Sequence, residues 1–152
     1  VVVRPSSVGL KTLQAGEWFE LSATADVVIE SNKPVLVAQF MASSGLTGKS
    51  LGDPAMMLLR PVSAMGSRAQ FWAPGEYTTN FVTVAAPTGS QIKLDTKVQA
   101  AGVAIPQTGW SVWRLGLSAG HHLIESSDRL GGILHGWTKD GSYGHNVGFM
   151  GQ

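Results

Sequence analysis

The sequence contains no cysteine, few charged residues and no long hydrophobic run. Without cysteine, the 152-residue chain forms no disulfide and offers no thiolate to a metal or a substrate. Only 14% of the residues are charged, and the 11 Lys and Arg are scattered singly instead of forming the basic stripe of a nucleic-acid binder. No run approaches the roughly 20 apolar residues of a membrane span. We therefore expect neither nucleic-acid binding nor membrane insertion.

Glycine and proline interrupt the chain at short intervals. The 19 Gly and seven Pro separate segments that are rich in Val, Ile, Phe, Trp and Thr, which favour strands. We expect one domain over residues 1–152, all-β, built as a two-sheet β-sandwich of short antiparallel strands with little helix. The predicted strands are Glu17–Leu21, Val27–Ser31, Pro34–Met41, Ala55–Arg60, Ala69–Trp72, Thr78–Ala86, Gln91–Asp95, Trp110–Leu117, His122–Ser126, Gly132–Thr138 and Ser142–Phe149.

Hydrophobic patterning predicts which strands lie at the centre. Val35–Phe40 and Phe81–Ala86 are apolar on both faces, which favours central strands with covering layers. In Gln91–Asp95 polar and apolar residues alternate, with Ile92 and Leu94 on one face. This pattern predicts a strand with one solvent-exposed face. One window, Gly120–Leu130, keeps a helical period without an interrupting Gly or Pro.

Two motifs imitate catalytic or nucleotide-binding loops. Ser43–Ser50 reads SSGLTGKS, close to a phosphate-binding loop, but Gly52 and Pro54 would break the helix that such a loop needs. We therefore predict a Gly/Ser surface loop there. Gly116–Gly120 reads GLSAG, which matches the nucleophile elbow of α/β-hydrolases.

The elbow would make Ser118 a nucleophile, with Asp128 or Asp140 and then His145 completing a triad. An α/β-hydrolase needs a parallel sheet of βαβ units, which this chain does not show. We predict that Ser118 lies in a turn between two antiparallel strands, a hairpin that would carry His121 and His122 away from it. A serine hydrolase acting through Ser118 stays a distant alternative.

Histidine and tryptophan could also form sites. Adjacent residues of a strand point to opposite faces, so His121 and His122 cannot bind one metal ion together. The four His have no acidic cluster close by, and we expect no metal and no cofactor. Five Trp residues could supply a sugar-stacking platform, although most should lie in the core. Trp72 is favoured as an exposed one because the loop Ala73–Glu76 follows it.

Three stretches together resemble one known family. They are GDPAMMLLRPVS (Gly52–Ser63), YTTNFVTVAAPTGSQIKLD (Tyr77–Asp95), and a run from WSVWRLGLSAGHHLIESS (Trp110–Ser127) into LGGILHGWTKDGSYGHNVG (Leu130–Gly148). Together they resemble the N-terminal domain family of the IgGFc-binding protein, which also occurs in many exported bacterial proteins. The resemblance implies an extracellular or cell-surface β-rich module, one part of a longer chain with its export signal outside these residues. No catalytic activity is ascribed to that family.

The sequence departs from the family pattern at two turns. Thr96 follows Leu94 and Asp95 where the family typically has Gly, which suggests a different hairpin turn because Thr tolerates positive φ poorly. His145 stands where the family typically has Tyr. The Fc partner of the family title is not carried over, because no residue motif for it can be matched in this chain.

The functional expectation is a non-catalytic binding or adhesion module that recognises a protein or glycan surface. The alternative is a structural spacer that stacks neighbouring domains of the same chain. Candidate ligand residues are Trp72, Asp53, Tyr143 and His145. Structural roles also explain some of them: Asp53 can cap the turn before a strand through its side chain, and Tyr143 can cover the end of a sheet.

Overall fold

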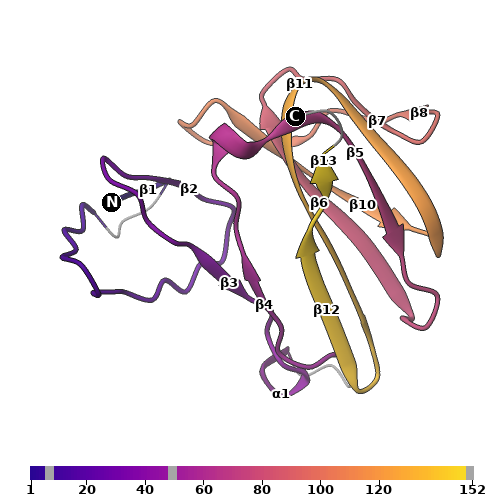
Figure 1. Cartoon of the computed structure of the whole chain (residues 1–152), viewed down its shortest axis with the longest axis horizontal. Coiled ribbons are helices and arrows are strands. Elements are labelled where there is room, and N and C mark those ends of the chain that lie inside the picture. The colour runs from indigo at the N-terminus through magenta and orange to yellow at the C-terminus, as the bar shows by residue number, and fades with distance from the viewer. Residues whose placement is uncertain (6–8, 48–50, 150–152) are drawn as a thin grey trace.

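The computed structural model describes residues 1–5, 9–47 and 51–149. A curled antiparallel sheet of nine strands forms one side of the molecule, and two short two-stranded ribbons from the N-terminal part form the other (Figure 1). The helical elements described are one turn, α1 (Ser44–Thr47), and one 3₁₀ turn, η1 (Val62–Ala64). The all-β prediction is confirmed.

The nine strands form one continuous sheet. Along its main path the order is β13 (Gly148–Phe149), β5 (Gly66–Ala73), β11 (Gly120–Thr138), β6 (Thr79–Pro87), β10 (Trp110–Leu117) and β9 (Val103–Ile105). Off this path, β12 (Gly141–Asn146) and β7 (Ile92–Leu94) also pair with β11, and β8 (Lys97–Val98) pairs with β7. Three of these strands, β8, β9 and the short β13, were not predicted as separate elements.

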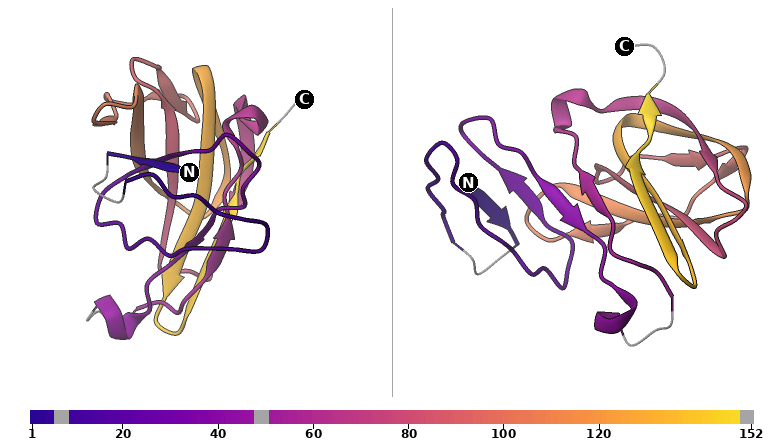
Figure 2. Two further views of the ribbon diagram at one scale, coloured as in Figure 1. Left: turned by 90° about the vertical axis from the view of Figure 1, so that its left-hand side faces the viewer. Right: turned by 60° about the horizontal axis from the view of Figure 1, so that its bottom comes forward.

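Strand β11 joins the two layers of the fold. Its first part pairs with β5 and β7, and its second part pairs with β6 and β12. A register shift between Glu125 and Leu130 marks the point where one part gives way to the other. The sheet therefore curls, and its two halves face each other as the layers of the predicted sandwich (Figure 2).

The helical period of Gly120–Leu130 does not produce a helix. This segment belongs to β11, and β5 and β7 hydrogen-bond to its two edges. Strand β5 pairs with Gly120–Glu125 and β7 pairs with Ile124–Ser126, so the backbone of most of this segment is hydrogen-bonded in the sheet and tertiary structure overrides a weak local preference. The two strands predicted over His122–Ser126 and Gly132–Thr138 are parts of this one strand.

The core lies between the two halves of the sheet. Strand β6 sits between β11 and β10 and alternates buried with half-buried residues, which confirms Phe81–Ala86 as a central strand. Ile92 is 1% exposed, so the face assigned to it from alternation is also confirmed. The buried side chains of this core come from Ala69, Phe71, Val82, Val84, Ala86, Ile92, Trp113, Ile124, Leu130, Leu134 and Val147.

The other segment expected at the centre is not there. Within Val35–Phe40, strand β3 (Ala38–Phe40) pairs only with β4 (Met56–Leu58) in the described structure, and Leu36 and Phe40 are 77% and 69% exposed. The prediction of a central strand is wrong because an apolar run has the same pattern whether a second layer covers it or not.

The first ribbon also differs from expectation. Strand β2 (Val28–Glu30) agrees with the predicted Val27–Ser31, but its partner is β1 (Val2–Arg4), which was not predicted. No strand forms over Glu17–Leu21. The phosphate-loop imitation at Ser43–Ser50 contains the turn α1, and its last residues, 48–50, lie outside the described residues.

Polar contacts fasten the N-terminal part to the outward side of the β6–β10–β12 half. Arg114 forms an ion pair with Asp26, and the Asn146 side-chain amide donates to the Leu58 carbonyl at 2.6 Å. Buried Met57 lies over Gly144, where a Cβ would collide with the Met57 side chain. Strand β4 therefore rests on β12.

An aromatic row lies on that same outward side. The rings of Phe81, His135 and Trp137 stack with centroids 5.5 to 6.1 Å apart. Burial lowers the pKa of His135, and the charge of Arg114 lowers it further, so the neutral ring is favoured. The His135 ring hydrogen-bonds the Thr83 hydroxyl at 2.9 Å.

Gly136 tests the packing between β11 and its neighbours. A Cβ at this position would lie 2.5 Å from the Thr79 carbonyl oxygen and 2.8 Å from the Asn80 side-chain oxygen. Gly136→Ala should therefore lower the free energy of unfolding by about 1–3 kcal/mol, the range for an overpacked site. Urea denaturation measures this change.

Gly148→Ala is the matched control, because nothing lies within 4 Å of a Cβ there. It should change the stability by less than about 0.5 kcal/mol. Equal effects of the two substitutions would contradict the packing described for β11.

Candidate functional site

Asp53, Tyr143 and His145 gather where strand β12 meets the segment before β4. The Asp53 backbone N–H donates to the Ser142 hydroxyl at 3.0 Å, so the bond that positions it runs through the backbone. Gly52 beside it has a φ of +84°, and a Cβ there would lie 2.8 Å from the Ser142 hydroxyl oxygen. A glycine is favoured at this crossing because other residues rarely adopt this angle and because a Cβ would displace the Ser142 hydroxyl from the Asp53 N–H.

The hydroxyl of Tyr143 is used inside the protein. It donates to the Asn80 side-chain oxygen at 2.6 Å, and the Asn80 amide in turn donates to the Pro74 carbonyl. The rings of Tyr143 and Tyr77 meet edge to face at 4.6 Å. Burial, with a smaller contribution from Tyr77, raises the pKa of Tyr143 to about 12, so the phenol keeps its proton. Tyr143 thus closes one end of the sheet.

His145 and Trp72 remain at the surface. The His145 ring is exposed, lies 6.0 Å from the Tyr143 ring and donates from Nδ1 to the Asn146 carbonyl. Trp72 is 63% exposed on β5, and no described hydrogen bond, ion pair or ring contact links it to the other three candidates. Trp18 is 79% exposed as well, and only Trp113 of the five tryptophans is buried, so the prediction that most of them lie in the core is wrong. The four candidates therefore form one group of three and one separate residue.

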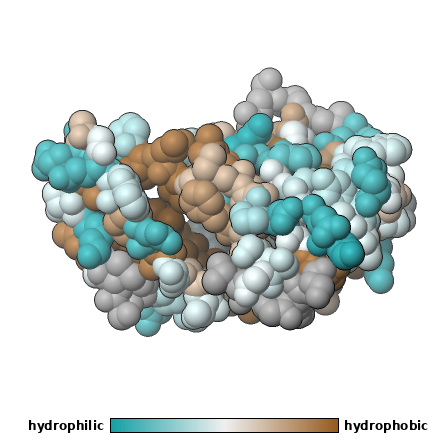
Figure 3. Space-filling model, turned by 90° about the horizontal axis from the view of Figure 1, so that it is seen from below, coloured by the Kyte–Doolittle hydropathy of each residue, from teal (hydrophilic) through white to brown (hydrophobic). Residues whose placement is uncertain are grey.

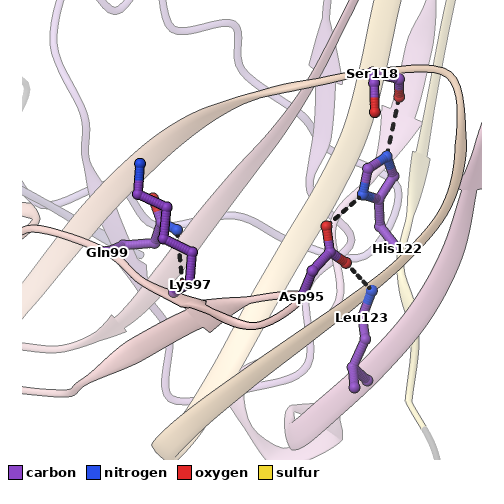
Figure 4. Close-up of polar contacts among 6 residues, drawn as sticks. All are labelled: Asp95, Lys97, Gln99, Ser118, His122 and Leu123. Atoms are coloured by element: carbon purple, nitrogen blue, oxygen red, sulfur yellow. Dashed lines mark hydrogen bonds and ion pairs between the residues drawn. The ribbon is translucent and has the colours of Figure 1, made fainter.

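Ser118 lies at a corner between the two halves of the sheet (Figure 4). Strand β10 before it pairs with β6 and β9, whereas the first part of β11 after it pairs with β5 and β7. The prediction of a hairpin at Ser118 is therefore wrong. The prediction that His122 lies far from Ser118 is also wrong, because His122 Nε2 lies 3.0 Å from the Ser118 carbonyl oxygen.

The His122 ring is held on both sides by acceptors. Nδ1 lies 3.0 Å from the Asp95 carboxylate, and Nε2 faces the main-chain oxygen of Ser118. Each nitrogen therefore has to carry a proton when both bonds form. In a serine-hydrolase triad the histidine instead bonds the serine hydroxyl and accepts its proton. His122, which is 7% exposed, links the corner at Ser118 to the β7–β8 hairpin through these two contacts.

Asp95 occupies the turn where the sequence departs from the family pattern. It has a φ of +55°, a left-handed conformation that Asp tolerates better than Thr. Its carboxylate accepts from the Leu123 backbone N–H at 2.9 Å and from His122. Burial raises the pKa of Asp95, but these hydrogen bonds outweigh it, so the pKa lies below its ordinary value.

A surface that sequence reasoning missed lies on the β3–β4 ribbon. Its outward face, here called the ribbon face, is apolar, and Met57 on the opposite face is buried. Seen from below, hydrophobic side chains gather around a hollow in the half of the molecule that the N-terminal ribbons occupy (Figure 3). The ribbon face consists of Leu36, Ala38, Phe40, Met56 and Leu58, which are all exposed.

Comparison with known proteins gives one match. The family model described as IgGFc binding protein matches residues 1–136. The chain belongs to the IgGFc-binding protein family. No curated protein and no solved structure matches the chain. The family membership that the three sequence stretches suggested is therefore confirmed, and it points to an extracellular binding module.

Among the described residues, no helix is long and apolar enough to cross a membrane. No group of three or more His, Asp or Glu residues is placed to hold a metal ion in the described part of the chain.

Asp95→Asn tests the link between the β7–β8 hairpin and β11, in which the Asp95 carboxylate accepts from His122 and from the Leu123 N–H. Asn keeps the side-chain size and tolerates positive φ, but it removes the charge that accepts two hydrogen bonds. Because the folded pKa of Asp95 is depressed, its contribution is present above the unfolded pKa of about 3.9 and is lost as pH falls through the folded pKa. The variant should be less stable by about 1 kcal/mol at pH 7. A stability difference that stays constant down to about pH 2 would contradict this account.

Tyr143→Phe tests the closed end of the sheet. It leaves the side-chain oxygen of Asn80, a residue that is 5% exposed, without its donor and should cost about 1–2 kcal/mol. The folded pKa of Tyr143 is raised, so wild-type stability should fall as pH rises from about 10 to 12, and this loss should be smaller in the variant. Tyr77→Phe is the control, because no described hydrogen bond uses that hydroxyl. Equal losses in the two variants would rule out the role of the Asn80 bond.

Proposed function

We propose that the chain is a non-catalytic extracellular module that binds a protein surface through the ribbon face. The observation that carries this proposal is the exposure of that face: Leu36 is 77% exposed, Phe40 69%, Met56 58% and Leu58 46%. Together they offer apolar area on the order of several hundred Å², the size of patches that mark interaction sites. The family description names a protein ligand, and a protein partner is the class that suits an apolar face.

The ribbon face has the composition of the centre of an interface. Phe40 and Met56 are cross-strand partners, and Ala38 and Leu58 form the next such pair on the same face. Aromatic residues and Met are enriched at the buried centre of protein interfaces, and charged residues are depleted there. With a net charge of +1, the protein gains little from long-range steering, so affinity would come from shape and apolar contact.

Several features support the absence of catalysis in this proposal. Both nitrogens of His122 face acceptors, which leaves the ring no lone pair for a serine proton when both bonds form. One hollow in the described part of the chain, beside Trp113 and lined by Gly102 and Val112 among others, measures about 200 Å³. Substrate pockets usually measure about 300–1,000 Å³.

A spacer role would use the same face differently. In that case the ribbon face would pack against a neighbouring domain of the same chain and would not bind a separate protein. The two roles differ in whether the isolated module captures a partner in solution.

Phe40→Lys is the direct test of the proposal. An array of purified extracellular proteins would be probed with the wild-type module and the variant. A lysine at the centre of an apolar interface should weaken binding by about tenfold or more. Folding should be unaffected, because the Phe40 side chain lies at the surface.

Val98→Lys is the matched control, since Val98 is 52% exposed on β8, outside the ribbon face. It should bind as the wild type does. An array on which the wild type binds nothing would favour the spacer, and binding that Phe40→Lys leaves unchanged would place the site elsewhere.

A further inference from the structure

A second exposed surface lies on the half of the sheet that the N-terminal ribbons do not cover. Strands β5 and β7 and the first part of β11 lie on the side of the sheet away from the ribbons (Figures 1 and 2). The outward side chains of these strands form the surface here called the Trp72 face. Its members are Arg68, Gln70, Trp72, Lys93, His121, Leu123 and Glu125.

Strand register sets the layout of the Trp72 face. Trp72 pairs with His121, Gln70 with Leu123, and Arg68 with Glu125. Paired residues point to the same side, so these side chains form two adjacent rows along the sheet. Trp72 and Arg68 are four residues apart on one strand, which places them about 14 Å apart at roughly 3.4 Å per residue.

The indole of Trp72 is free to stack. It is 63% exposed, and it takes part in none of the ring contacts among the described residues, whereas Trp137 stacks on both Phe81 and His135. The strip beside it is also open, because nothing lies within 4 Å of a Cβ position on Gly148, the neighbour of Gln70 on β13. A flat ring can therefore approach this side of the sheet.

The charges of the Trp72 face do not balance. Arg68 and Lys93 both lie near the single carboxylate of Glu125, at 3.5 and 3.6 Å, and all three side chains are at least one-third exposed. Such exposed pairs are weak, so the cations can turn to another anion. The nearby Asp95 carboxylate is already engaged by His122 and by the Leu123 backbone. One positive charge is therefore left over on this face.

We propose that the Trp72 face binds an acidic glycan, with a sugar ring stacked on Trp72 and a sugar carboxylate held by Arg68 or Lys93. The C–H face of a pyranose ring packs on an indole, and the guanidinium fork matches a carboxylate. Gln70 lies between Trp72 and Arg68 on β5, and His121 lies beside Trp72 on β11, so both can supply donors for sugar hydroxyls.

An acidic peptide fits this surface less well. Peptides are recognised in pockets or along an exposed strand edge, whereas the Trp72 face is the flat face of the sheet. Its outward side chains lie on β5, β7 and β11, and β13 pairs with the second edge of β5 only at Ala69 and Gln70. This site is independent of the protein-binding role proposed for the ribbon face.

The test is titration calorimetry with an oligogalacturonate, its neutral methyl ester and an oligoglutamate of similar charge. The wild-type protein should bind the oligogalacturonate most tightly. Trp72→Ala should bind it about tenfold more weakly, while Trp72→Tyr, which keeps an aromatic ring, should retain most of the affinity. Arg68→Gln should weaken binding and reduce its salt dependence.

Trp18→Ala is the matched control, since Trp18 is also an exposed tryptophan and lies outside the Trp72 face. It should bind as the wild type does. No binding of the oligogalacturonate, equal binding by Trp72→Ala, or equal affinity for the oligoglutamate would each overturn the proposal. The last result would show an acidic polypeptide site instead. Phe40→Lys should bind the glycan normally, which separates this site from the ribbon face.

Discussion

The pairing of both parts of β11 with their neighbouring strands is the constraint on which the rest of the fold depends. This 19-residue strand gives its first part to β5 and β7 and its second part to β6 and β12. The two halves of the sheet therefore cannot separate without breaking one continuous strand. Side chains from both parts, such as Ile124 and Leu134, are fully buried in the shared core. A chain without disulfides thus gains a single cooperative unit from backbone pairing and apolar burial.

This scaffold leaves two surfaces with different chemistry. The N-terminal part covers the outward side of one half and turns the apolar ribbon face of β3 and β4 to solvent. The other half keeps an open polar face around Trp72. The corner at Ser118 and the turn at Asp95 are fastened together by His122, so the strands that carry the open face are held in place from the inside. Buried polar ties of this kind fix geometry more than they add stability.

Local patterning predicted the elements whose environment is periodic. Trp110–Leu117 is a strand with the predicted bounds, and the alternation of Ile92 and Leu94 correctly assigned their inward face. The errors arose where long-range strand pairing determines the position of a segment in the fold. The sequence of an apolar run such as Val35–Phe40 does not show whether a second layer covers it. The five-residue motif around Ser118 likewise does not distinguish a hairpin from a corner between layers. The contact of His122 with Asp95 spans 27 residues, so no local pattern marks it. Exposure of Trp72 was predictable from the loop that follows it.

Native-state hydrogen exchange tests most directly the claim that a curled sheet forms the scaffold and leaves the ribbon face uncovered. The account predicts that amides of β6, β10 and both parts of β11 exchange slowest and at one common rate, because they open together. Amides of β3 and β4 should exchange much faster, since few buried contacts hold that ribbon. Protection of β3 as strong as that of β6 in a monomeric sample would contradict the account, because the ribbon face would then be covered within the chain.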